Sequence, residues 1–344
     1  MRRYERTLVA VAFATTVVAG TTGWASGSTQ QPVTGPPPGS AAWVADTSLG
    51  RPLPDPAVAT PVEVAAFFRS LDGREERELV RRHPLVVGNL DGVPVRLRYE
   101  ANSLAIRGTS YERLTGRRIL AFDPRGRGQV AEVYGDVERA RQVSVIVPGS
   151  DIDAATYDRD RANDPYGTPA AMAKSLRAAT GGATAVVVWT GYTTPVGVGV
   201  DAATGDLAEA GATRLARFTQ GLTATGAPRP ALFCHSYGSV VCGLAADEVD
   251  ARDIVVFASP GMRARHVKAL GTDARVWAAK DPSDWISKVP YVRFAGLGHG
   301  NDPTAPSFGA RRVPAERAEG HTGYFAPGTD SLRAFAAIAE GDVR

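Results

Sequence analysis

The stretch that decides the fold is Ala231-Leu-Phe-Cys-His-Ser236-Tyr-Gly-Ser-Val-Val-Cys-Gly243. It begins as a short apolar strand, turns at His-Ser-x-Gly and continues in the small residues of a closely packed helix. Such a reversal from strand to helix is the context that a nucleophile elbow of the G-x-S-x-G type requires. The turn raises the hydroxyl of Ser236 above the edge of a sheet, and the helix N-terminus beneath it favours developing negative charge.

The elbow departs from the usual pattern at one position. The residues two before and two after the serine must both be small, and Gly238 meets this requirement while Cys234 replaces the first glycine. We expect the turn to be kept but slightly widened. Cys242 follows eight positions after Cys234, and in an exported protein the two could form a disulfide. Because helix-to-strand distances often exceed the limit of about 7 Å between Cα atoms, we expect two packed free thiols instead.

Short apolar runs rich in β-branched residues alternate with helical patterns from residue 118 onward. Continuously apolar strands suit a sheet covered on both faces, and strand–helix alternation predicts a mostly parallel, doubly wound α/β sheet. The predicted strands are 119–122, 130–134, 143–147, 185–189, 231–233, 254–257 and 276–279. Helices are predicted after a capping box at Thr60-Pro-Val-Glu63 and over 75–82, 168–179, 207–222 and 329–341.

An elbow serine needs a base, and the base follows the acid along the chain. Of the five histidines, His83 and His235 precede the serine, and His266 precedes the strand that should present the acid. His321 lies shortly before the last predicted helix, in the loop where such a fold delivers its base, so we favour it. His299, in a glycine-rich loop, is the alternative base and otherwise a loop or substrate contact.

The acid should follow the last predicted strand, where two aspartates occur. We favour Asp284, because the Trp-Ile pair after it can anchor the loop on the core. Asp281 is the alternative, and it otherwise caps the turn at the next proline. The oxyanion needs two backbone donors, one of them the N–H after the nucleophile, here Tyr237. The second comes from the loop after an earlier strand, for which Ser150 is our candidate.

Further short motifs are spread along residues 57–344. They are Gly88-Asn-Leu-Asp-Gly-Val-Pro94, Leu120-Ala-Phe-Asp-Pro124, Val145-Ile-Val-Pro-Gly149, Trp189-Thr-Gly-Tyr192, Ala258-Ser-Pro-Gly261, Gly296-Leu-Gly-His-Gly300, Phe308-Gly-Ala-Arg311 and Gly320-His-Thr-Gly-Tyr-Phe325. With the elbow, they make the chain resemble an actinobacterial α/β-hydrolase domain family of unknown function. The resemblance implies an α/β-hydrolase fold, with helices on both faces of the sheet, and a triad centred on Ser236. It implies no particular substrate.

The amino terminus has the pattern of a secretory signal peptide. Three arginines within the first six residues precede an apolar run over Leu8–Val18, which is short for a membrane span of about 20 residues. We therefore expect a signal peptide over 1–25, with an uncleaved membrane anchor as the alternative. Residues 26–56 are rich in Pro, Gly and Ser and predict a disordered linker. The remaining 57–344 are expected to form one α/β-hydrolase domain.

Composition narrows the function classes. The 344 residues are 44% hydrophobic and 22% charged, which excludes a largely disordered chain, and two cysteines exclude a disulfide scaffold and a four-cysteine zinc site. Much of the net charge of +3 comes from the amino-terminal arginines, so we expect no nucleic-acid partner. No His-x-x-x-His pattern or cluster of ligand residues occurs, and we expect no metal and no cofactor.

These features predict an exported serine hydrolase that acts on carboxylic esters through an acyl-enzyme. The expected substrate is a small-molecule or lipid-like ester, and membrane contact is expected only through the amino-terminal segment if it stays uncleaved. An acyltransferase with the same triad is one alternative, and a non-catalytic binding module on a hydrolase scaffold is another. The sequence predicts neither the acyl preference nor the oligomeric state.

Overall fold

The structure, a computed structural model, describes residues 29–343. The predicted signal peptide over 1–25 and the first three residues of the predicted linker lie outside this range. No helix in the described range is long and apolar enough to cross a membrane.

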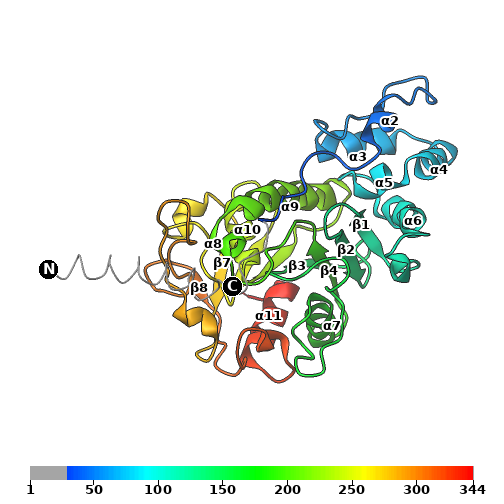
Figure 1. The fold of residues 1–344 in the computed structure, drawn as a ribbon. Coiled ribbons are helices and arrows are strands. Elements are labelled where there is room, and N and C mark those ends of the chain that lie inside the picture. Colours follow the sequence, from blue (N-terminus) through cyan, green and yellow to red (C-terminus); the bar gives the residue numbers. More distant parts are fainter. Residues whose placement is uncertain (1–28, 344) are drawn as a thin grey trace.

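One eight-stranded sheet forms the centre of the molecule, in the order β1-β2-β4-β3-β5-β6-β7-β8 (Figure 1). β2 is antiparallel to both β1 and β4, and all pairs from β4 to β8 are parallel. The predicted strands are confirmed, and the mostly parallel sheet agrees with the expected fold class. The strands are β1 (Ile119–Asp123), β2 (Gln129–Tyr134), β3 (Gln142–Val147), β4 (Thr184–Thr190), β5 (Ala231–His235), β6 (Asp253–Phe257), β7 (Arg275–Ala279) and β8 (Arg311–Arg312).

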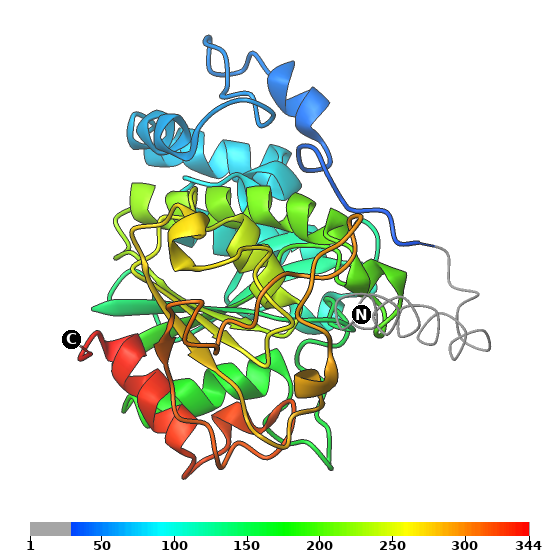
Figure 2. The ribbon, with the colours of Figure 1, turned by 90° about the vertical axis from the view of Figure 1, so that its left-hand side faces the viewer.

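Helices cover both faces of the sheet, as the apolar strands require. α9 (Asp206–Ala224) and α10 (Gly238–Leu244) cover one face, and α7 (Pro169–Ala179) and α11 (Asp330–Glu340) cover the other (Figure 2). Because successive side chains of a strand point to opposite faces, β5 contributes to both layers. Leu232 packs in the apolar cluster under α9 and α10, whereas Phe233 packs in the cluster with α7 and α11.

A group of helices precedes the sheet and packs at its β1 end, at the upper right of Figure 1. The predicted capping box is confirmed, since the Glu63 N–H donates to Thr60 Oγ1 and the Thr60 N–H donates to the Glu63 carboxylate. These helices enclose a third apolar cluster of their own. They are α2 (Ser40–Val44), α3 (Pro61–Arg69), α4 (Gly73–Arg82), α5 (Pro84–Asn89) and α6 (Val95–Ile106). Shorter elements are η1 (Glu112–Leu114), α8 (Val200–Ala203), η2 (Val267–Leu270), η3 (Trp285–Lys288) and η4 (Gly323–Phe325).

The expected disordered linker over 26–56 is wrong for residues 29–56, which pack against the domain. Trp43 is fully buried in the third cluster, and its indole N–H donates to the Pro54 carbonyl at 2.7 Å. The ring of Trp43 also meets the His83 ring edge-on, and the His83 ring lies 2.8 Å from Asp46. A proline-rich composition suggests that little apolar surface is buried, but one tryptophan anchors this segment by burying its whole side chain.

Candidate active site

Ser236 lies in a strained turn between β5 and α10. Its φ of 51° falls in the left-handed region, which residues with a side chain rarely adopt. The Ser236 N–H donates to the Phe257 carbonyl of β6 at 3.0 Å, which holds the turn in place. The strand and the helix on either side of the turn are both buried, so the surrounding packing maintains the strain.

Two glycines allow the chain to pass close to this turn. A Cβ on Gly149, in the loop after β3, would lie 2.7 Å from the Ser236 Cβ. A Cβ on Gly238 would lie 2.4 Å from the Val147 carbonyl oxygen. The nearest neighbour of Gly238 is therefore the end of β3, not Cys234. This explains why the elbow accepts a cysteine in place of its first glycine.

Cys234 and Cys242 form a disulfide, so the expected pair of free thiols is wrong. Their Cα atoms are 6.5 Å apart, within the limit for a bridge, because α10 turns back directly over β5. Both residues are fully buried in the cluster beneath the turn. The disulfide ties the strand before Ser236 to the helix after it.

His321 connects Ser236 with Asp284. It lies in the loop between β8 and α11, and its Nε2 is 3.0 Å from Ser236 Oγ. Its Nδ1 is 2.8 Å from Oδ1 of Asp284, which lies in the loop after β7. With the proton on Nδ1, the ring donates to the carboxylate and accepts from the serine hydroxyl. The structure thus brings together the three residues favoured from the sequence, from three separate loops.

Asp284 is held as a carboxylate acceptor. Burial opposes its ionisation, but hydrogen bonds from His321, the Ile286 N–H and the Tyr324 hydroxyl outweigh this and lower the pKa of Asp284. Tyr324 donates to Oδ2 at 2.9 Å, while His321 occupies Oδ1. Burial and the nearby Asp284 charge raise the pKa of Tyr324, so its hydroxyl keeps the proton that it donates.

The alternative acid and base make their hydrogen bonds elsewhere. Asp281 accepts from the N–H and hydroxyl of Ser283 and from the Gly320 N–H, so it holds the loop that leads to His321. His299 is buried, and its Nε2 lies 2.7 Å from the Ala202 carbonyl. Burial lowers the pKa of His299 to about 4.

Sequence reasoning missed two aromatic neighbours of His321. The ring of Trp285 lies 4.5 Å from the His321 ring and covers one side of it. The His235 ring lies 4.9 Å from the His321 ring at an interplanar angle of 52°, and its Nε2 is 2.8 Å from the His321 carbonyl oxygen. Burial and the proximity of His321 lower the pKa of His235 to about 3, so His235 donates as a neutral ring. The one sequence signal for Trp285 is its position immediately after the predicted acid, Asp284.

The two expected oxyanion donors border Ser236. Tyr237 is the next residue, and Ser150 follows Gly149, whose backbone lies against the Ser236 side chain. In the described range, neither the Tyr237 nor the Ser150 N–H donates to a protein acceptor. The Tyr192 hydroxyl donates to the Pro148 carbonyl at 2.7 Å and so fixes the loop that carries this donor. Residues 29–343 contain no group of three or more His, Cys, Asp or Glu side chains arranged to hold a metal ion.

Similar proteins are known by sequence. Two uncharacterized proteins of Mycobacterium tuberculosis, from strains CDC 1551 / Oshkosh and ATCC 25618 / H37Rv, are each 27% identical over 375 residues. The alignments cover 84% of this chain and 57% of each relative, so the chain spans little more than half the length of these relatives.

Solved structures with a similar arrangement include a serine hydrolase without a lid from Xanthomonas campestris. It has a TM-score of 0.38 and 15% identity, over 62% of this chain and 89% of that chain. A propionate-bound esterase from the planctomycete Thermogutta terrifontis has a TM-score of 0.37 and 12% identity, over 62% and 88%. A family model described as alpha/beta hydrolase matches residues 123–294, which is half of the chain. On this match, the protein belongs to the alpha/beta hydrolase family.

Proposed function

We propose that the protein is a serine hydrolase that cleaves carboxylic esters through an acyl-enzyme. The observation that carries this proposal is the continuous contact from Ser236 through His321 to Asp284, at 3.0 Å and 2.8 Å. A nucleophile beside a base, which is itself oriented by a third group, is the arrangement that nucleophilic catalysis needs. The choice of an ester over other acyl compounds rests on analogy with other elbow hydrolases.

In the first half of the reaction, Ser236 Oγ attacks the acyl carbon and its proton moves to His321 Nε2. The imidazolium then gives this proton to the leaving alkoxide as the C–O bond breaks, which leaves the acyl group on Ser236. In the second half, His321 takes a proton from water, the hydroxide attacks the acyl carbon, and the proton returns to Ser236 Oγ as the acid departs.

The remaining groups orient His321 and stabilise the charges that form during the reaction. Asp284 holds the Nδ1–H tautomer of His321 and stabilises the imidazolium, and Tyr324 keeps the carboxylate in that orientation. The N–H groups of Tyr237 and Ser150 receive the oxyanion, and each such donor typically lowers the barrier by about 3 kcal/mol.

We also propose that the chain is exported. The signal-like amino terminus motivates this proposal, and the buried Cys234–Cys242 disulfide supports it, because disulfides persist mainly in oxidising compartments.

The test is hydrolysis of a chain-length series of nitrophenyl esters by the wild type and by Ser236→Ala. We expect turnover by the wild type and loss of about five orders of magnitude in Ser236→Ala. The exposed Ser287→Ala, on η3, is the matched control and should retain the wild-type rate. Absence of turnover in the folded wild type would favour the binding-module alternative. Product analysis with added alcohols tests the acyltransferase, which would form the new ester in preference to the free acid.

A further inference from the structure

Two loops beside Ser236 expose apolar side chains to solvent. One loop follows β4 and runs into α8, and the other follows η3. Single exposed apolar residues are common, but a contiguous set on a soluble protein marks an interaction surface. We call this set the apolar rim; its members are between 46% and 80% exposed, and they are Val196, Val198, Val200, Val292, Phe294 and Leu297.

The two loops form one connected surface. The Gly298 N–H donates to the Ala203 carbonyl at 2.8 Å, and His299 Nε2 lies 2.7 Å from the Ala202 carbonyl. The second loop is closed by a bridge between Phe294 and Leu297, with backbone N–H to carbonyl distances of 2.9 and 3.0 Å. Figure 2 shows this loop, in orange, rising beside α8 on the face toward the viewer. The apolar side chains are thus exposed on a backbone that hydrogen bonds hold in place.

The apolar rim borders the candidate active site on two sides. On one side, the Asp151 N–H donates to the Pro195 carbonyl and the Gly197 N–H donates to Asp151 Oδ1, both at 2.8 Å. Asp151 directly follows Ser150, the expected oxyanion donor. On the other side, Trp285 covers the His321 ring and is itself 41% exposed. The apolar rim therefore adjoins the loop that carries the expected oxyanion donor beside Ser236.

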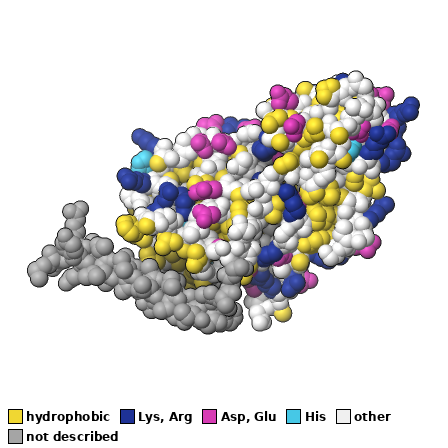
Figure 3. Space-filling view, turned by 45° about the horizontal axis from the view of Figure 1, so that its top comes forward, with side chains coloured by type: hydrophobic (Ala, Val, Ile, Leu, Met, Phe, Trp, Pro, Cys, Tyr) yellow, Lys and Arg dark blue, Asp and Glu magenta, His cyan; other side chains and the backbone are white. Residues whose placement is uncertain are grey.

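Two features on this side of the molecule indicate the partner. They are the charged side chains near the apolar rim and the place where the chain enters the described structure. Two basic residues are exposed near Phe294: Lys288, at the end of η3, and Arg293, on the loop that follows it. The chain also enters the described structure here, since the Gln30 N–H donates to Asp201 Oδ2 beside α8. Twenty-eight residues precede Thr29, and they include the apolar run Leu8–Val18. Figure 3 shows hydrophobic side chains at the left of the described surface, with both basic and acidic side chains beside them.

We infer that the apolar rim docks on an anionic lipid surface, from which the acyl chain of a lipid ester reaches Ser236. Apolar side chains flanked by cations are the pattern that binds the interface of anionic membranes. A two-fold pairing with a second copy fits less well, because it would bring Lys288 and Arg293 against a surface of the same charge. The substrate part of this inference rests on the proposed function, whereas the docking part does not.

The test is co-sedimentation of the full chain with phosphatidylcholine vesicles that contain about one third phosphatidylglycerol. We compare the wild type with the double variant Phe294→Ser/Leu297→Ser. The matched control is Val58→Ser/Val62→Ser, which removes two other exposed apolar residues, in and near α3. We expect the partition coefficient of the rim variant to fall about tenfold or more, and that of the control to stay within about twofold.

Equal sedimentation of the wild type and the rim variant would overturn the inference, including the case in which residues 1–28 alone bind the vesicles. A wild-type dimer that the rim variant dissociates, without vesicle binding, would also overturn it in favour of a second copy. Hydrolysis separates the two proposals. The rim variant should cleave a dissolved nitrophenyl acetate at the wild-type rate and a vesicle-borne ester about tenfold more slowly. Rim-dependent binding without any Ser236-dependent hydrolysis would keep the docking surface and reject the proposed function.

Discussion

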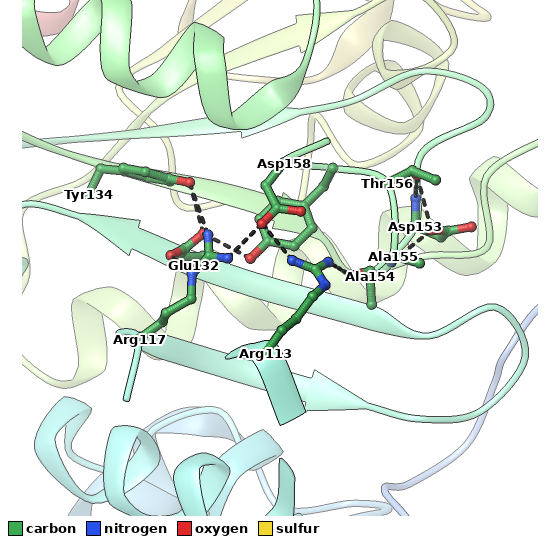
Figure 4. A network of polar contacts seen from close by, with 10 residues as sticks. Arg113, Arg117, Glu132, Tyr134, Asp153, Ala154, Ala155, Thr156 and Asp158 are labelled. Atoms are coloured by element: carbon green, nitrogen blue, oxygen red, sulfur yellow. Dashed lines mark hydrogen bonds and ion pairs between the residues drawn. The ribbon is translucent and has the colours of Figure 1, made fainter. Parts of the chain in front are cut away.

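The Ser236 cluster and a second polar cluster at the β1 edge of the sheet differ in how completely their groups are bonded. In the edge cluster, Glu132 of β2 accepts from Arg117 and from the hydroxyls of Tyr134 and Tyr157 (Figure 4). Arg117 also pairs with Asp158, which in turn accepts from Arg113. We call Arg113, Arg117, Glu132, Tyr134, Tyr157 and Asp158 the edge network.

Shifted pKa values occur in both clusters, so they do not by themselves show which cluster is catalytic. Burial opposes ionisation of Asp158, but its arginine partners lower its pKa, just as His321 lowers that of Asp284. The Ser236 cluster differs in other respects: a strained backbone at Ser236, N–H donors without a protein acceptor, and a partly exposed His321. A fully bonded network stabilises the fold, whereas strain and unused hydrogen-bonding capacity are what a reaction needs.

The largest effect is expected from His321→Ala. Removal of the base should lower kcat on a nitrophenyl ester by about five orders of magnitude, because Ser236 then has no group to accept its proton. His299→Ala is the comparison, and it should keep kcat within about tenfold, since His299 bonds to Ala202 and not to Ser236. Steady-state kinetics on both variants test this pair. The reverse result, with His299→Ala inactive and His321→Ala active, would assign the base to His299.

The next effect is expected from Asp284→Asn. The amide cannot hold the Nδ1–H tautomer of His321 as the carboxylate does, so kcat should fall about 10⁴-fold. Asp281→Asn should lower kcat less than this, because Asp281 supports the neighbouring loop through Ser283 and Gly320 and is not hydrogen-bonded to His321. The measurement is kcat for each variant, with circular dichroism to show that both fold. A larger loss in Asp281→Asn than in Asp284→Asn would contradict the assignment of the acid.

In the edge network, Glu132→Gln should reduce stability and leave catalysis alone. The change removes the charge of one of the two carboxylates that pair with the partly buried Arg117, and we expect the free energy of unfolding to fall by about 2 kcal/mol. Urea denaturation measures this loss, and kcat of the folded variant should match the wild type. A variant with unchanged stability and reduced kcat would reverse the distinction between the two clusters.

The smallest expected effect is a loss of stability in acid. It should come from His235 and His299, on the active-site side of the comparison, and not from the edge network. Folding lowers the pKa of His235 to about 3 and that of His299 to about 4, from an ordinary 6.5. The unfolded chain therefore takes up protons first as the pH falls below about 6.5, so the free energy of unfolding decreases from there toward pH 4. Carboxylates with lowered pKa values in either cluster contribute only near and below their ordinary 3.8.

His299→Gln isolates one part of this acid response. Glutamine still offers an N–H toward Ala202 but does not titrate, so the fall in stability should become shallower by up to about 1 kcal/mol per pH unit. Urea denaturation at a series of pH values between about 6.5 and 4.5 measures the slope. An identical slope in His299→Gln and the wild type would show that His299 titrates normally in the folded protein.

The sequence predicted the elements that local pattern determines. Apolar runs located the strands, and the elbow motif and the chain order selected Ser236, Asp284 and His321, which the structure brings together. This works because the carboxyl ends of parallel strands meet at one edge of the sheet, so order along the chain implies proximity.

Features that depend on distances between separate elements were missed. The Cys234–Cys242 pairing requires knowing how closely α10 returns over β5, and the sequence gives only their spacing. The packing of Trp43 requires the cluster formed by helices that follow it in the chain. Glu132 lies in a strand with apolar residues on either side of it, and nothing local indicates that Arg117 and two tyrosines surround it.

The central claim is that Ser236 is the nucleophile, and fluorophosphonate labelling of the folded protein tests it most directly. The account predicts that the wild type gains one covalent phosphonyl group on Ser236, located by peptide mass spectrometry, whereas Ser236→Ala gains none. His321→Ala should be labelled far more slowly than the wild type, because its serine is not activated. Absence of labelling in the folded wild type, or equal labelling of Ser236→Ala, would contradict the account.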